Sequence, residues 1–374
     1  MKKIFTINCG STSTKVAYFE DDKMMSKISL TITAEQLKEM PKTLDQLEFR
    51  TNQVKEFLEE NNLNPSEFDI VVSRAGTIPS VPYDGAYEVN DLMIASVTYA
   101  PEAQHASTLS CLIADKLVKG LGVPVIIYDP TCVDSADEIA KITGIPEIIN
   151  MPIAHLLNTK MAGITYAESI GKEYKDLNLI IVQLGGGITL GFHDHGRIAD
   201  WVYDDEGPMS PQRAGAIPTR YLVDYCYKSN KTLQQMRMHL CGQSGVVAYF
   251  GTQDVRDVEK MIDEGDEKAK LILKAMAYGV SKSIGQLSVV RGGKVDQIIL
   301  TGGVAYSERI TDWIKEKVSF IAPVSIIPGE REMEALAAGG LRILNNEEEV
   351  HPYIYYPRGY NSIEDIFSNP NELA

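Results

Sequence analysis

Two segments of the 374-residue chain share one plan, in which a buried strand enters a tight turn and a second strand returns from it. Strands predicted over 4–7 and 15–19 flank the first turn, and strands over 179–184 and 188–192 flank the second. In each copy an amide stands two positions before the first glycine, Asn8 before Gly10 and Gln183 before Gly185. Gly10 and Gly185 lie 175 residues apart (185 − 10), close to half the chain. This spacing predicts two similar α/β domains that face each other, not a short-period solenoid.

The rest of the chain alternates between patterns typical of strands and of helices. Such alternation indicates an α/β architecture. We expect two domains, residues 1–150 with 336–374 and residues 151–335. The Ala-rich last helix is expected to cross between them. Strands are predicted over 68–73, 123–128, 297–300 and 320–327, and helices over 106–117, 153–170, 267–290, 307–318 and 332–344.

Charge narrows the classes of function that the chain can have. Lys and Arg number 36 against 51 Asp and Glu, which gives a formal net charge of −15. A chain this acidic repels phosphate backbones and anionic lipid headgroups, so we expect neither nucleic acid nor a membrane as a partner. No apolar run approaches the roughly 20 residues that a transmembrane helix needs.

Cysteine usage indicates the compartment. The five cysteines are scattered and form no CxxC pair, so neither a zinc site nor a redox pair is predicted. A reduced, cytoplasmic environment is the simplest explanation. The apolar stretch after Lys3 is too short for the core of a signal peptide, and Asn8 interrupts it.

The first turn, residues 8–15, has chemistry suited to a phosphate group. Gly10 lets the backbone approach a ligand closely, and successive turn N–H groups can form an anion-binding nest. Ser11 and Ser13 add hydroxyl donors. The turn does not match the G-x-x-x-x-G-K-[ST] pattern. Taken alone, it fits an ordinary Ser/Thr-rich hairpin equally well.

Two glycine clusters are further candidates. Three consecutive glycines at 185–187 mark a place where a side chain is not tolerated, although a simple tight turn is the more common explanation. The segment Thr301-Gly302-Gly303 is predicted as a turn between a strand and a helix, which is a natural place for a nucleotide. An ordinary packing pair of glycines explains this segment equally well.

Taken together, these segments resemble the acetokinase family, and most closely its butyrate and branched-chain carboxylic acid kinases within the acetate kinase, sugar kinase and actin superfamily. The resemblance implies an α/β fold of two facing ribonuclease-H-like domains with ATP in a central cleft, the actin-like ATPase fold. The N-terminal domain would hold the substrate and phosphate side, and the C-terminal domain the nucleotide. The matching motifs run collinearly to about residue 345: NCGSTSTK at 8–15, SRAG at 73–76, YDGAYEVND at 83–91, AQHAS at 103–107, YDPTCVD at 128–134, QLGGGITLG at 183–191, DEGPMSPQRAG at 205–215, GGVAYS at 302–307 and PGEREMEALAAGGLRIL at 328–344.

The resemblance implies the reversible formation of an acyl phosphate, with butyrate and ATP giving butanoyl phosphate and ADP. A short-chain carboxylate is already ionised at neutral pH, so no general base is required. Catalysis must come from positioning and positive charge, because both reactants are anions. The alternatives are an acetate, propionate or branched-chain acid kinase and, from another class, a non-catalytic ATP-binding protein of the same fold. The resemblance also implies a homodimer or higher homo-oligomer.

Arg213, in SPQRAG, would stabilise the transferring phosphoryl group, because a planar guanidinium grips two oxygens at once. Without the resemblance, a surface arginine that caps a loop is the likelier interpretation. Arg74 would hold the substrate carboxylate, although its position in the motif departs from acetate kinases. His155 would donate to phosphoryl oxygens. His105 is expected to be structural.

Asp129 would orient Arg213 or water around Mg²⁺, and Glu334 would be the magnesium-linked glutamate, with Glu332 as the alternative. Mg²⁺ commonly takes only one or two carboxylates, so this pair suffices. Gln183 stands where the family usually has His, which removes any protonation role there. The remaining contacts are assigned as a group, with phosphate and nucleotide on Asn8, Ser11, Ser13, Lys15, Gly185, Gly186, Gly187, Gly302 and Gly303.

The family pattern stops near Leu344, and a Tyr-rich tail follows His351. The tail is either a strap that packs against the first domain or a contact between subunits. We favour the strap.

Overall fold

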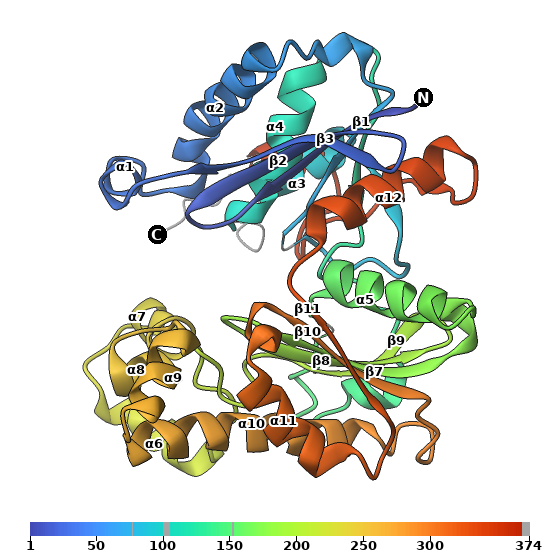
Figure 1. Cartoon of the computed structure of the whole chain (residues 1–374). Coiled ribbons are helices and arrows are strands. Elements are labelled where there is room, and N and C mark those ends of the chain that lie inside the picture. The colour runs from blue at the N-terminus through green and yellow to red at the C-terminus, as the bar shows by residue number, and fades with distance from the viewer. Residues whose placement is uncertain (77, 100–104, 152, 369–374) are drawn as a thin grey trace. The chain divides into compact units, whose positions relative to one another are not determined.

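The computed structural model describes residues 1–76, 78–99, 105–151 and 153–368 (Figure 1). The chain divides into two compact units, Met1–Asp134 with Arg331–Ala374 and Ser135–Glu330. The first boundary lies before residue 135 and not at 150, because the segment after it is bonded to the second unit. The Asp137 carboxylate binds Arg197 and Arg291 at 2.7 and 2.6 Å, and its N–H donates to the carbonyl of Ala199.

The first unit is built on a seven-stranded sheet with the order β12-β5-β6-β4-β1-β2-β3. β1 and β2 form the antiparallel hairpin that the sequence predicted, and β4 and β6 run parallel to β1. β1 is buried on both faces, which explains its nearly continuous apolar sequence. The strands are β1 (Lys3–Cys9), β2 (Ser13–Glu20), β3 (Lys23–Thr31), β4 (Ile70–Ser73), β5 (Ala86–Glu88), β6 (Val125–Tyr128) and β12 (Val350–His351).

Helix α12 (Glu332–Leu344) has the predicted bounds and packs against β1 and β4. A Cβ atom at Gly340 would meet Val72 and Ile4, so the two glycines of the helix allow a close approach to the sheet. The expected crossing between domains is wrong, because the first unit resumes at Arg331 and contains the whole helix. The other helices of this unit are α1 (Ala34–Glu39), η1 (Thr43–Asp45), α2 (Gln46–Glu60), η2 (Pro65–Glu67), α3 (Asp91–Tyr99), η4 (Ala106–Thr108), α4 (Leu109–Val118) and α13 (Ile363–Ser368).

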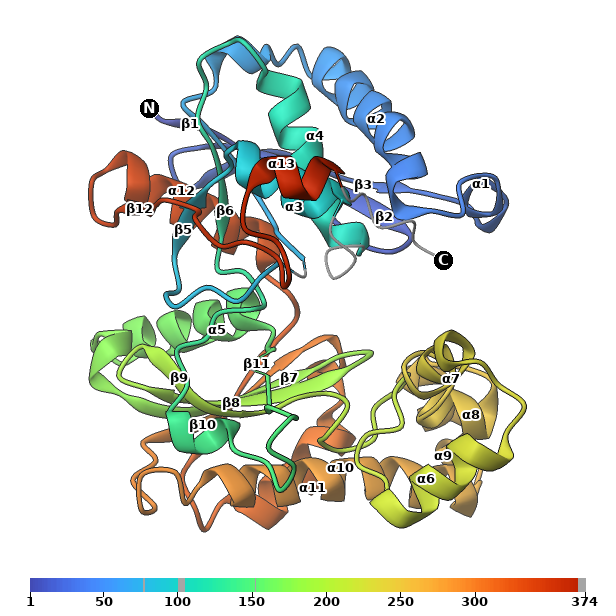
Figure 2. The same ribbon diagram turned by 180° about the vertical axis from the view of Figure 1, so that it is seen from behind.

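The Tyr-rich tail is a strap on the first unit, as favoured from the sequence. β12 pairs with β5, and Tyr353 is only 1% exposed. Farther along, α13 packs against α3 (Figure 2). The rings of Tyr99 and Phe367 lie 5.0 Å apart at this contact.

The second unit repeats the plan with a five-stranded sheet of order β11-β10-β7-β8-β9. β7 and β8 form the second predicted hairpin, while β10 and β11 continue the sheet in parallel with β7. Alternate residues of β7 belong to two cores. Ile180 and Val182 pack with α10, and Leu179 and Ile181 with α5, so these helices cover opposite faces. The strands are β7 (Asn178–Leu184), β8 (Ile188–Asp194), β9 (Arg197–Val202), β10 (Gln297–Gly302) and β11 (Val324–Pro328).

Several element bounds differ from those predicted. Thr301 and Gly302 end strand β10, and are not part of a turn. The strand expected to begin at Phe320 begins at Val324, since Phe320 is 85% exposed after the end of α11. The sequence reading missed the helices over 219–263. The helices of this unit are η5 (Glu138–Lys141), α5 (Leu156–Ser169), η6 (Tyr174–Asp176), α6 (Thr219–Lys228), α7 (Leu233–Leu240), α8 (Val246–Phe250), α9 (Val255–Asp263), α10 (Glu267–Leu287), η7 (Gly303–Tyr306) and α11 (Glu308–Val318).

Among the described residues, no helix combines the length and apolar character needed to cross a membrane.

Candidate active site

In the first unit, three predicted site residues gather at one edge of the sheet. β1, β4 and β6 are neighbouring parallel strands, with Ile7 beside Ser73 and Ser73 beside Ile127. Asn8 is the last residue but one of β1, and Arg74 and Asp129 directly follow β4 and β6. The carboxyl ends of parallel strands are the usual place for a ligand in an α/β unit.

The start of α12 brings a carboxylate to this edge. The Asn8 side chain donates to Glu332 Oε2 at 2.6 Å, and the guanidinium of Arg74 forms an ion pair with Glu332 Oε1. Both partners of that ion pair are largely buried. Glu334 contributes a second carboxylate, whose Oε2 is buried and has no hydrogen-bond partner among the described residues. Glu332, which was the alternative glutamate, is therefore the one that contacts Asn8 and Arg74.

Asp129 is held in an unusual backbone conformation. Its φ is +44°, which is rare for a residue other than glycine, and its side chain is 3% exposed. Its Oδ1 accepts a hydrogen bond from the N–H of Gly85 at 2.8 Å, and its own N–H donates to the carbonyl of Gly85 at 2.9 Å. These two bonds fix the direction of the carboxylate at the strand end.

The turn between β1 and β2 exposes its polar groups. The N–H of Gly10 donates to the carbonyl of Ser13 at 2.8 Å and closes the turn. Ser11 and Thr12 are exposed at its tip. Lys15 lies on β2, half-buried and in register with Asn8. The turn therefore places Ser11, Ser13 and Lys15 beside the strand that carries Asn8.

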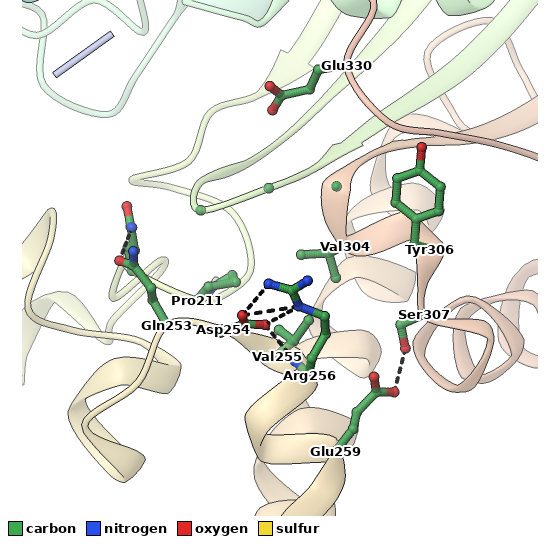
Figure 3. A pocket seen from close by; sticks show the side chains of 14 residues that line it. Pro211, Gln253, Asp254, Val255, Arg256, Glu259, Val304, Tyr306, Ser307 and Glu330 are labelled. Carbon is green, nitrogen blue, oxygen red and sulfur yellow. Dashed lines mark hydrogen bonds and ion pairs between the residues drawn. The ribbon is translucent and has the colours of Figure 1, made fainter. Parts of the chain in front are cut away.

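In the second unit, a cavity of about 600 Å³ opens at the carboxyl ends of β7 and β10 (Figure 3). Predicted residues Gly185, Gly186 and Gly303 line it, while Gly187 and Gly302 lie beside these in the chain. The volume is in the range typical of small-molecule sites. The other lining residues are Pro211, Gln212, Gln253, Asp254, Val255, Arg256, Glu259, Val304, Tyr306, Ser307 and Glu330.

Steric contacts explain most of these glycines. Gly302 has a φ of +90°, and a Cβ there would overlap the backbone of Leu184. A Cβ at Gly186 would lie 2.9 Å from the side-chain oxygen of Gln212, and one at Gly187 would collide with the carboxylate of Asp204. Gly303 has no such neighbour and faces open space. The turn at 185–187 is therefore more than a tight hairpin, because it must fit under the loop over 204–213.

Arg213 is the last residue of that loop and is not a loop-capping surface arginine. Its Nε donates to Asp204 Oδ2 at 2.7 Å, and its Nη1 lies 3.4 Å from Asp205 Oδ1. Burial acts to lower the pKa of the Arg213 guanidinium, but Asp204, Cys241, Tyr203 and Asp205 together outweigh it and raise this pKa. Burial raises the pKa of Asp204 to about 6, although Arg213 opposes the shift. Asp204 Oδ1 is buried without a hydrogen-bond partner among the described residues.

The two histidines have different surroundings. His155 precedes α5, and its Nδ1 lies 2.9 Å from the hydroxyl of Thr189 on β8. His105 accepts a hydrogen bond from the N–H of Ser107 and caps η4, which is the structural role expected for it. Residues 103 and 104 of its motif lie outside the described residues.

Gln183 replaces the usual histidine of the family without leaving its neighbours unsatisfied. Its Oε1 accepts from Asn158 at 2.6 Å, and its Nε2 lies 3.5 Å from Glu330 Oε1. The Gln183 amide on β7 therefore links Asn158 on α5 to Glu330, which lies just after β11.

The sequence reading missed three contributors to these sites. Asp204 stands one residue before the DEGPMSPQRAG motif, and only its burial reveals its contact with Arg213. Asp254 holds Arg256 at the cavity wall, with two oxygens on the guanidinium at 2.8 and 2.5 Å. This contact lowers the pKa of Asp254 to about 2. A D-x-R spacing at a helix start could have been noticed. Arg50, considered below, gave no local signal.

Comparisons with known proteins agree with this arrangement. A family model described as the acetokinase family matches residues 155–322. The chain is 41% identical to butyrate kinase 2 of Clostridium acetobutylicum over 353 residues, which cover 94% of this chain and 99% of the relative. The chain belongs to the acetokinase family. Butyrate kinase 1 of the same organism is 40% identical over 94% of this chain and 100% of its own length.

A solved structure establishes the fold of this acetokinase family member. The acetate kinase of Porphyromonas gingivalis superposes with a TM-score of 0.75 at 17% identity, over 92% of this chain and 100% of that structure. The predicted actin-like ATPase fold is thereby confirmed. The prediction of a carboxylate kinase, a phosphotransferase, is confirmed as well.

Proposed function

We propose that this acetokinase transfers the γ-phosphoryl group of ATP reversibly to butyrate, which gives butanoyl phosphate and ADP. The observation that carries the substrate is the identity of 41 and 40% to two butyrate kinases over nearly their whole lengths. The acetate kinase with the same fold is only 17% identical. Acetate, propionate and branched short-chain acids are the competing substrates.

The cavity of the second unit is the proposed site for ATP. The backbone of Gly185, Gly186 and Gly303 lines this cavity, so phosphate oxygens can approach the chain there without meeting a side chain of these residues. Arg213 borders the turn at Gly187, 3.3 Å from the position of a Cβ there. A guanidinium in this place can stabilise the charge that develops on the transferring phosphoryl group. In the second unit His155 would add a hydrogen-bond donor, and in the first unit the residues of the 8–15 turn would hold phosphate oxygens.

Arg74 is the proposed clamp for the substrate carboxylate. Its present partner, Glu332, is itself a carboxylate, so the contact displays the geometry that the guanidinium offers to such a group. Binding of butyrate to Arg74 would replace that ion pair and release Glu332. The released carboxylate would remain bonded to Asn8.

The first unit offers only part of the ligands that Mg²⁺ needs. Among the described residues no three His, Cys, Asp or Glu side chains form a complete metal site. Mg²⁺ bound with nucleotide needs only one or two protein carboxylates, because phosphate oxygens and waters supply the rest. The buried, unpartnered Oε2 of Glu334 offers one such ligand, and Asp129 is the second carboxylate that we propose. When bound, the ion would neutralise phosphate charge.

The remaining proposals concern the setting of the enzyme. All five cysteines carry free thiols, which is compatible with a cytoplasmic location. A homodimer or higher homo-oligomer is proposed from the family. Light scattering coupled to size-exclusion chromatography measures the assembly directly.

A hydroxamate assay tests the proposed reaction. Purified protein is incubated with MgATP, hydroxylamine and each straight or branched acid from two to six carbons, and acyl hydroxamate is measured. We expect the highest kcat/KM for butyrate. A higher value for acetate would reject the substrate assignment. Binding of ATP without hydroxamate from any acid would instead favour a non-catalytic ATP-binding protein.

A further inference from the structure

A completely buried arginine lies beneath the turn between β1 and β2. Arg50, on α2, has no exposed surface. Its Nη1 donates to the carbonyl of Ser13 at 2.9 Å and to the hydroxyl of Thr14 at 3.0 Å, and its Nη2 donates to the carbonyl of Ser11 at 3.1 Å. One guanidinium therefore holds both sides of the turn.

The partners of this guanidinium carry no compensating charge. On the side away from the turn, Gln46 Oε1 accepts from Nε at 3.2 Å and from Nη2 at 2.8 Å. Among the described residues Arg50 has no carboxylate partner, and Cys9 is the titratable group that it meets. Burial raises the pKa of the Cys9 thiol, so this group stays neutral at physiological pH. The positive charge of Arg50 is consequently not neutralised.

Two other arginines of the chain, in contrast to Arg50, have carboxylate partners. Arg213 rests on Asp204, and Arg342 binds Glu348 at 2.7 Å. Burying a charge without a counter-ion is strongly unfavourable, even when its hydrogen bonds are satisfied. Such an arrangement calls for a nearby anion that is not part of the chain.

The turn above Arg50 is shaped to receive that anion. Its carbonyl groups point away from the tip, since those of Ser11 and Ser13 bind Arg50 and that of Thr12 accepts from the N–H of Ile32 at 2.9 Å. The N–H groups of Ser11 and Thr12 donate to no other described residue. Consecutive donors of this kind form an anion-binding nest.

We infer that Arg50 is a positioning residue for the transferred phosphoryl group: it turns the carbonyls of the loop inward and places an uncompensated positive charge under the loop donors. This inference rests on the proposed function, because the anion it serves is a phosphoryl group of ATP or of the acyl phosphate. Gln46 completes the arrangement, since it holds the guanidinium without cancelling its charge.

Gln46→Glu separates the charge of Arg50 from its role as a scaffold. The variant keeps an acceptor at the same place and adds a negative charge beside the guanidinium, so the loop geometry is retained and the positive field is cancelled. We expect the Kd for MgATP, measured by calorimetry, and the KM for butanoyl phosphate to rise about tenfold. The melting temperature should stay equal or increase, because the buried charge gains a partner.

Asn52→Asp is the matched control. Asn52 lies on the same helix, is exposed, and is not among the hydrogen-bond partners of Arg50. This variant has the same net charge as Gln46→Glu and should leave both constants within about twofold. Equal constants for the Gln46→Glu variant and the wild type would overturn the electrostatic part of the inference.

Arg50→Lys provides a second readout. A buried lysine has a lowered pKa, so it loses its charge at a pH where arginine keeps it. The Kd for MgATP should therefore increase more steeply with rising pH in this variant than in the wild type. Parallel pH profiles would overturn the inference. A wild type that binds MgATP but forms no acyl hydroxamate would reject the proposed function instead, and the binding constants would still test Arg50.

Discussion

In the first unit the turn between β1 and β2 carries hydroxyl side chains and rests on the guanidinium of Arg50. In the second, the corresponding turn between β7 and β8 is three glycines that fit under the loop holding Arg213. Each arginine lies against its turn, yet Arg213 has two nearby carboxylates whereas Arg50 has none among the residues that the structure describes. One hairpin plan thus supports two different ways to hold a turn that we propose to bind phosphate.

The difference shows where the constraint on each turn comes from. A Cβ at Gly10 would lie 3.7 Å from Ser13 Oγ, an ordinary contact, so the first turn is fixed from beneath and its own residues have space. The second turn is fixed from above by Asp204 and Gln212, and its residues have none. Charge follows the same division, because Arg213 forms an ion pair with Asp204.

The largest effect is expected at Arg213, the arginine with counter-ions. Arg213→Ala should lower kcat for hydroxamate formation by about 10³-fold, since the guanidinium would stabilise charge that develops only in the transition state. Calorimetry should find a Kd for MgATP within a few-fold of the wild type. Turnover near the wild-type level would remove Arg213 from the mechanism. Arg213→Lys, which keeps the charge and loses the planar fork, should recover only part of the rate.

Glycine substitutions test the steric half of the comparison. Gly187→Ala should lower the free energy of unfolding of the second unit by about 2–3 kcal/mol, because the new methyl group meets the Asp204 carboxylate. Both tryptophans, Trp201 and Trp313, lie in this unit, so tryptophan fluorescence during urea unfolding reports on it. Gly10→Ala is the matched variant in the first turn and should change stability little, as judged by circular dichroism. Equal effects at Gly10 and Gly187 would refute the assignment of the constraint.

Both hairpins could be predicted because their information is local. Strands such as β7 are runs of apolar residues that end at consecutive glycines, and α12 combines a helical pattern with a proline–glycine stop before it. Apolar burial and turn chemistry act over a few residues, so a window of sequence contains them. The helices over 219–263 were missed because they bury little. α6 has no buried residue, and its pattern therefore records no core.

The candidate site was predictable only in part, for the same reason. Asn8, Arg74 and Asp129 could be named because the resemblance to the acetokinase family points to them, and because the strand ends near which they lie are visible in the sequence. The choice between Glu332 and Glu334 could not be made, since it depends on which carboxylate the start of α12 turns toward Asn8. From the sequence alone, Arg50 cannot be distinguished from the other charged residues of an amphipathic helix. Its importance comes from contacts with a turn 36 to 39 positions earlier in the chain.

The smallest expected effect concerns the charge that Asp204 brings to Arg213. The pKa of Asp204 is about 6 in the folded protein and 3.8 in the unfolded chain. Between these two pH values the folded protein therefore keeps a proton that the unfolded chain has lost. The resulting stabilisation is complete below pH 4 and disappears as the pH rises through 6. Relative to the wild type, Asp204→Asn should therefore gain about 2 kcal/mol in free energy of unfolding between pH 4 and pH 6.5, followed by tryptophan fluorescence. Loss of the Arg213 contact adds an offset that does not vary with pH.

Asp254 supplies the comparison of opposite sign in the same unit. Its contact with Arg256 lowers the pKa of the carboxyl to about 2, so the stabilisation is present above pH 4 and is lost as the pH falls toward 2. Asp254→Asn should thus be less stable than the wild type at pH 7, and the deficit should shrink on acidification. If the two aspartate variants followed the pH with the same sign, burial would not be the cause of the Asp204 shift. The difference in free energy of unfolding between variant and wild type should therefore change with pH in opposite directions for the two variants. That result would show that the Arg256 contact outweighs desolvation at Asp254, whereas the Arg213 contact does not outweigh it at Asp204.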